Sequence, residues 1–94
     1  MFSAYEGVKG LAKEHPDWLR VVKGCYDLAP EYEKFAGAYV VDKVGWFPSL
    51  RLLVRYGILV KVGETVRGGR RAYYSMPDRQ GVGRALRQLG VLRD

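Results

Sequence analysis

The sequence lacks asparagine and has only one cysteine, Cys25, and one histidine, His15, among its 94 residues. A lone cysteine excludes an intramolecular disulfide and a cysteine-based metal cluster. No apolar run approaches the ~20 residues of a membrane span, and the start lacks the basic and apolar regions of a signal peptide. We therefore expect a cytoplasmic protein without membrane contact. The scarcity of thermolabile amides indicates a thermophilic source.

Acidic residues are scarce in the second half of the chain. Residues 1–47 carry six lysines and arginines against seven acids, a net charge of −1. Residues 48–94 carry ten lysines and arginines against three acids, a net charge of +7. The two halves together give the +6 of the whole chain. A pI near 9.7 with cations gathered on one part is typical of a protein that binds polyanions. A surface made only for solubility usually mixes both signs.

The sequence contains no recognisable catalytic site. His15 precedes a proline in a predicted loop, where a solvated turn residue is the ordinary role. Cys25 lies among apolar residues of a predicted helix, where a buried, inert thiol is expected. There is no phosphate-loop, dinucleotide or zinc motif. Gly81-x-Gly83 is not a nucleotide-binding loop, because it lies inside a predicted helix without an apolar strand before it. We expect no enzymatic activity, cofactor, metal ion or small-molecule substrate.

Capping signals predict four helices outside the central stretch. Ser3 and Glu6 form a capping box that begins a helix over 3–14, which ends at His15-Pro16. Asp17 is expected to cap a second helix over 17–28. A third helix is expected over 36–44, and a last helix over 78–89. The third helix is expected to end at Gly45. The last helix is expected to begin with Asp78 as N-cap and to end at Gly90.

Residues 46–76 form the stretch around which the chain is organised. Pro48 at the first position predicts a helix over 48–56, with Leu50, Leu53 and Val54 on its apolar side and Gly57 at its end. A strand over 58–62 and its partner over 70–76 then form a hairpin around the glycine-rich loop 63–69. Because side chains alternate across a strand, one of Tyr73 and Tyr74 should be buried and the other exposed. Trp46 and Phe47 either fill the core or rest on a partner.

This order of motifs resembles the second half of a winged helix-turn-helix domain. The pattern Leu50-x-x-Leu53-x-x-x-Gly57-Ile58-Leu59 is similar to a recognition helix that runs into the first wing strand. Gly68-Gly69-Arg70-Arg71-x-Tyr73-Tyr74 is similar to a wing tip and its returning strand. The resemblance covers roughly residues 34–89.

The resemblance implies an α+β winged helix-turn-helix fold, with helices followed by a two-stranded wing hairpin and a C-terminal helix. The whole chain, 1–94, would be one domain. Its parts would be an N-terminal extension helix over 1–16, the helix-turn-helix and wing over 34–76, and the C-terminal helix over 77–94.

The candidate contact residues follow from this layout. The outward face of helix 48–56 carries Ser49, Arg51, Leu52, Arg55 and Tyr56, with Arg51 suited to bidentate contact with guanine. Lys43 and Ser49 lie at helix ends, where phosphates are commonly held. The loop glycines permit close approach to a DNA backbone, and arginine forks suit phosphate oxygens. The wing candidates are Arg67, Gly68, Gly69, Arg70 and Arg71.

We therefore expect a small transcriptional regulator that binds double-stranded DNA, with helix 48–56 in the major groove and wing 63–71 on the backbone. One such helix reads few bases, so a homodimer is expected. The helices 4–14 and 78–89, outside the helix-turn-helix, are the candidate dimer surface. Two alternatives stay open: an RNA- or ribosome-associated binder, and a protein-interaction module of a larger complex.

Overall fold

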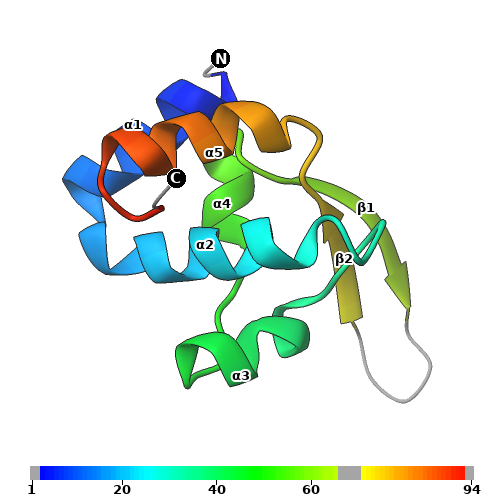
Figure 1. The fold of residues 1–94 in the computed structure, drawn as a ribbon. Coiled ribbons are helices and arrows are strands. Elements are labelled where there is room, and N and C mark those ends of the chain that lie inside the picture. The colour runs from blue at the N-terminus through cyan, green and yellow to red at the C-terminus, as the bar shows by residue number, and fades with distance from the viewer. Residues whose placement is uncertain (1–2, 66–70, 93–94) are drawn as a thin grey trace.

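The computed structural model describes residues 3–65 and 71–92, which form helices and one antiparallel hairpin (Figure 1). Within these ranges the fold class is α+β, as the sequence predicted. The helices are α1 (Ala4–Glu14), α2 (Leu19–Leu28), α3 (Val41–Val44), α4 (Arg51–Arg55) and α5 (Arg79–Gln88). The strands are β1 (Val60–Thr65) and β2 (Arg71–Ser75).

Helices α1 and α5 lie side by side, although one is near the start of the chain and the other near its end (Figure 1). Val8 and Leu11 of α1 and Val82 and Leu86 of α5 are fully buried in one core. The Arg84 guanidinium also lies 4.7 Å from the Tyr5 ring centroid. The apolar stripes of these helices are therefore buried inside the chain, and the expectation that they form a dimer surface was wrong.

Both ends of α1 and the beginning of α5 follow their capping signals. The Ser3 hydroxyl accepts a hydrogen bond from the Glu6 backbone N–H, and the Asp78 carboxylate accepts one from Gly81. The second helix differs from its prediction, because Pro16–Trp18 form a 3₁₀ turn and the Asp17 side chain makes no capping bond. The α-helix therefore begins at Leu19 instead of Asp17.

The helix expected over 36–44 is mostly a 3₁₀ turn. Residues Gly37–Val40 form that turn, and α3 adds only four residues before Gly45, whose φ of +84° ends it as predicted. Glycine and β-branched valines are weak helix formers, which explains why this segment does not extend into a longer helix. Gly37 also lies so close to the Pro48 carbonyl that a Cβ there would be 2.6 Å from the oxygen.

Helix α4 is shorter than the predicted 48–56. Pro48 is buried against Gly37 and precedes the helix, so it is not the first helical residue. The first helical carbonyl is that of Leu50, which accepts hydrogen bonds from the N–H groups of Leu53 and Val54. Leu50 and Leu53 face the core as predicted, whereas Val54 is exposed.

The hairpin begins two residues later than expected. Ile58 and Leu59 are buried, and their N–H groups bond to the Leu53 carbonyl at 3.0 and 3.4 Å, so they close the end of α4. Strand β1 then pairs with β2 from Val60↔Ser75 to Thr65↔Arg71, with a bulge between Lys61 and Gly63. The loop between the strands, 66–70, lies outside the described residues.

A short bridge attaches the hairpin to the helices. Phe35 and Tyr74 exchange two backbone hydrogen bonds of 2.9 and 2.8 Å, and both side chains are buried. One tyrosine of the pair, Tyr74, is buried as predicted, whereas Tyr73 is half-buried where an exposed side chain was predicted. β2 is thus bonded on both sides, whereas within the described chain β1 is paired only to β2.

Candidate nucleic-acid interface

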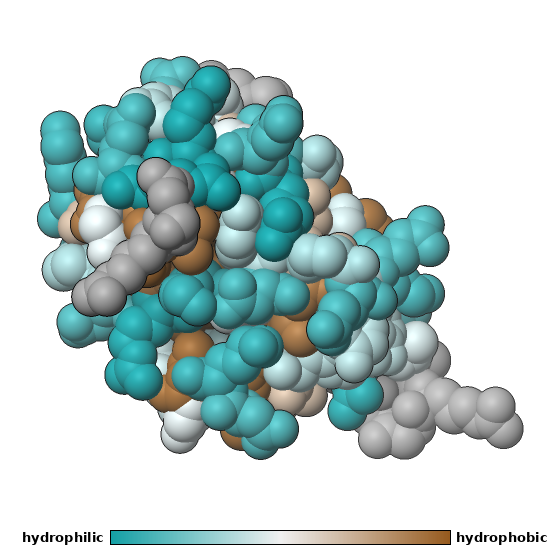
Figure 2. Space-filling view, in the orientation of Figure 1, coloured by the Kyte–Doolittle hydropathy of each residue, from teal (hydrophilic) through white to brown (hydrophobic). Residues whose placement is uncertain are grey.

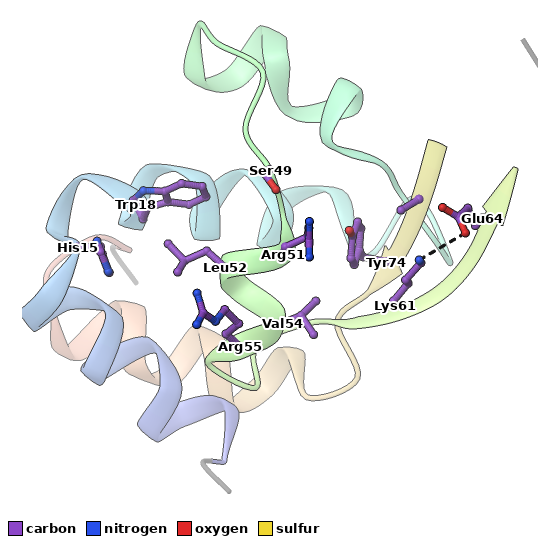
Figure 3. Close-up of a pocket in the computed structure, with 11 residues that line it drawn as sticks. His15, Trp18, Ser49, Arg51, Leu52, Val54, Arg55, Lys61, Glu64 and Tyr74 are labelled. Atoms are coloured by element: carbon purple, nitrogen blue, oxygen red, sulfur yellow. Dashed lines mark ion pairs between the residues drawn. The ribbon is translucent and has the colours of Figure 1, made fainter. Parts of the chain in front are cut away.

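An open hollow of about 1320 Å³ lies between the end of α1, helix α4 and the hairpin (Figure 3). Its volume exceeds the ~1,000 Å³ typical of large small-molecule pockets, so it suits a macromolecular surface better than a small ligand. The residues that line it are His15, Trp18, Ser49, Arg51, Leu52, Val54, Arg55, Lys61, Glu64, Ala72 and Tyr74.

Three cations from two elements meet in this hollow. Arg51 and Arg55 are one helical turn apart on α4, so both lie on the same side of the helix, and both are exposed. Lys61 enters from β1 and lies 3.6 Å from the Glu64 carboxylate (Figure 3). Among the residues that the structure describes, neither arginine is part of an ion pair. Both guanidinium forks can therefore bind an outside anion without breaking an internal bond.

Helix α4 is held in place by packing. A helix of five residues is far too short to be stable by itself. Leu53 anchors it in the core, and the carbonyl of Tyr56 rests directly on Gly7 of α1. The Tyr56 ring lies on Gly10 and makes an edge-to-face contact with His15, with ring centroids 6.3 Å apart. The arginines therefore project from a rigidly seated turn of helix.

Tyr56 belongs to this packing and does not line the hollow. Partial burial raises the pKa of its hydroxyl, as do the hydrogen bond and negative charge of Glu14, while Arg55 opposes the shift. The sequence predicted that the Tyr56 side chain faces outward. It packs on α1 instead, where the small residues Gly7 and Gly10 leave room for it.

The other predicted contact residues fall into four groups. Ser49, Arg51, Leu52 and Arg55 line the hollow together. Lys43 instead lies on α3 against Gly24 of α2 and does not line the hollow. Arg71 is exposed at the beginning of β2, opposite Thr65. The remaining wing candidates, Arg67, Gly68, Gly69 and Arg70, lie outside the described residues.

Several lining residues could not be found from the sequence pattern. His15 and Trp18 come from the turn after α1, about 30 residues before α4, and no local motif joins them to it. Lys61 had a usable signal, because it lies on the strand that leads into the basic loop.

The two aromatics before α4 are exposed. Trp46 is 43% and Phe47 is 67% accessible, so of the two roles left open for them, filling the core does not hold. Trp46 contacts Trp18 edge to face, with ring centroids 5.3 Å apart and planes at 90°. Pro48, the next residue, is buried.

Other kinds of site find no support in the described ranges. No group of three or more metal-binding side chains occurs there. Burial raises the pKa of the Cys25 thiol to about 12, so at neutral pH it is a protonated, inert core residue. No helix in these ranges has the length and apolarity to cross a membrane. The face seen in Figure 2 is mostly hydrophilic, with apolar surface only in small separate areas.

What this surface can do follows from its own residues: it offers two guanidinium groups, one ammonium group and neighbouring aromatic rings in one open concavity. The donor set suits anions of extended shape, such as a phosphate backbone. Comparison with family models, with curated proteins and with solved structures found no match for this chain.

Proposed function

We propose that this protein binds double-stranded DNA as a small transcriptional regulator, with α4 toward the major groove and the hairpin loop along the backbone. The observation that carries the proposal is the pair Arg51 and Arg55, unpaired within the described chain and exposed beside Lys61 in one hollow. The order α3, α4, hairpin, α5 is consistent with a winged-helix-like layout and supports the same function.

The proposed contacts divide by chemistry. Arg51 lies at the beginning of α4 and serves base recognition, since a guanidinium fork matches guanine O6 and N7. Arg55, Lys61 and Arg71 serve the phosphates, which fix the register of the protein on the duplex. Neutralising about five phosphates lowers affinity several-hundred-fold between about 50 and 200 mM salt, from a slope of about −0.9 per phosphate.

A homodimer on a pseudo-palindromic site remains part of the proposal, because one short helix reads few base pairs. The apolar stripes of α1 and α5 cannot serve as its interface, since they are buried against each other. The outer edge of β1, with Val60 and Val62 exposed at 43% and 50%, is the alternative surface. Sedimentation at micromolar concentration, with and without DNA, tests this part; a monomer in both conditions would refute it.

Fluorescence anisotropy across a salt series tests the main proposal. The ligand is a mixed-sequence duplex of about 30 base pairs, and the variants are Arg51→Ala and Arg55→Ala. The matched control is Arg20→Ala, which removes an exposed arginine on α2 outside the hollow. We expect each hollow variant to lower the salt slope by about one, or to change the preference among sequences, while the control does neither.

Two results would reject the proposal. One is the absence of duplex binding by the wild type even at low salt. The other is preferential competition by structured RNA of equal length, because arginine contacts to phosphate do not by themselves distinguish DNA from RNA. That second result would transfer the hollow to the RNA-binding alternative, with the same residues in use.

A further inference from the structure

Two aromatic side chains stand at one end of the hollow, and the proposed duplex contacts do not use them. Trp18 lines the hollow, and Trp46, which is 43% exposed, packs edge to face on it. We call Trp18 and Trp46 the aromatic corner. Its two tryptophans are the only tryptophans of the chain.

Packing does not account for this exposure. Large aromatic side chains normally bury most of their surface, and gathered exposed apolar groups mark binding sites. Trp46 keeps 43% of its surface exposed although it packs on Trp18. In an edge-to-face pair such as Trp18 and Trp46, one ring covers only one face of the other.

The surroundings of the aromatic corner define the chemistry of its ligand. The cations Arg51 and Arg55, which are on α4, line the same hollow as Trp18 (Figure 3). A fitting ligand therefore carries a flat ring and a negative charge a short distance apart. A nucleotide with an unpaired base meets both demands, since every base has a face that stacks on aromatic rings.

Bases within an intact duplex cannot meet the aromatic corner, because both of their faces are already stacked. We propose that the aromatic corner stacks on unpaired bases next to the bound duplex, so that DNA with a single-stranded extension is the preferred ligand. This inference rests on the proposed function, in that Arg51 and Arg55 hold the adjoining phosphates. It assigns to the chain a selectivity for single-stranded extensions, gaps or opened sites next to a duplex.

The test compares a blunt duplex of about 20 base pairs with the same duplex carrying about six unpaired thymidines on one 3′ or 5′ end. Anisotropy measures affinity, and tryptophan emission reports only from the aromatic corner, since no other tryptophan exists. We expect the extended duplex to bind about tenfold more tightly and to quench the tryptophans, while the blunt duplex leaves their emission nearly unchanged.

Trp46→Ala should remove most of this preference without altering affinity for the blunt duplex, and its unfolding midpoint serves as a folding check. Trp46→Phe keeps an aromatic ring and should keep the preference. The matched control is Tyr32→Ala, which removes an aromatic ring of 44% exposure that does not line the hollow. This control should leave both affinities unchanged.

Each contrary outcome points to one failure. Equal affinity for the two duplexes without quenching overturns the inference and leaves the proposed function standing. An equal loss of both affinities in Trp46→Ala also overturns it, because the ring would then be a general contact. A wild type that binds neither duplex overturns the proposed function and the inference together.

Discussion

The backbone carbonyl of Tyr56 lies directly over Gly7, so closely that a Cβ on residue 7 would stand 1.9 Å from the carbonyl oxygen. This contact joins α1 to the end of α4, where the chain turns through Gly57 at a φ of +75°. Gly10, one turn further along α1, meets only the Tyr56 ring, at 3.7 Å from its would-be Cβ. The two glycines therefore have different roles in the same helix.

Alanine substitution separates these roles. Gly7→Ala should lower the free energy of unfolding by about 3 kcal/mol, because a backbone carbonyl cannot move aside as a side chain can. Gly10→Ala should raise it by up to about 1 kcal/mol, since alanine favours the helix and the contact is an ordinary one. Urea denaturation monitored by circular dichroism measures both values. Similar midpoints for the two variants would contradict the close contact at Gly7.

A second glycine pair tests how the segment before α4 is held. A Cβ on Gly37 would lie 2.6 Å from the Pro48 carbonyl oxygen, whereas one on Gly24 would meet side chains of Val40 and Lys43 at 3.5 Å or more. We expect Gly37→Ala to cost about 2 kcal/mol and Gly24→Ala to be neutral or stabilising. Gly37→Ala should also weaken DNA binding in anisotropy, because Ser49 and Arg51 follow Pro48 within three residues.

The buried thiol of Cys25 predicts a loss of stability at alkaline pH. Its pKa is raised to about 12 in the folded chain, so the unfolded chain releases the proton first, near its ordinary value of 9.0. The stabilisation that this pKa difference gives the folded chain is complete below about pH 9. It decreases by about 1.4 kcal/mol per pH unit as the pH rises above that value. Between about pH 9 and 10.5, wild type should lose about 2 kcal/mol more than Cys25→Ala.

The comparison of wild type with Cys25→Ala controls for the tyrosines and lysines, because these groups titrate in both proteins. The comparison therefore uses the slope of unfolding free energy against pH and ignores the packing loss of the variant. Parallel slopes would contradict the burial of the thiol.

Glu64 is the acidic side chain among the described residues that line the hollow, and its carboxylate lies near the Lys61 ammonium. Glu64→Gln should strengthen DNA binding about threefold at low salt, because it removes a negative charge from the surface that we propose to face phosphates. The gain should fade as salt rises, since screening shortens the reach of exposed charges. Glu33→Gln, an exposed acid outside the hollow, should change little.

Helix ends were predictable wherever one or two neighbours determine them. Ser3 and Asp78 cap as expected, and Gly45, Gly57 and Gly90 all have positive φ. Each of these features depends on local backbone geometry, which a short sequence window contains. The same holds for the buried Leu50 and Leu53, whose spacing follows the helical period.

The remaining features depend on contacts between distant residues. Pro48 begins many helices, but here its carbonyl rests on Gly37, and the helix starts at Arg51. Tyr56 was expected outward because nothing near it in sequence announces the gap over Gly7 and Gly10. The wall made by His15 and Trp18 likewise comes from another segment, so this part of the candidate site could not be read from a motif.

The pairing of α1 with α5 also fixes an order of events during synthesis. Val8 and Leu11 leave the ribosome long before Val82 and Leu86, the residues that share their core. Until α5 has been made, α1 has no complete surface to pack on, and the seat of α4 on Gly7 is not secured. A nascent chain that stops after the hairpin therefore carries all the arginines of α4 yet lacks the support that holds them in position.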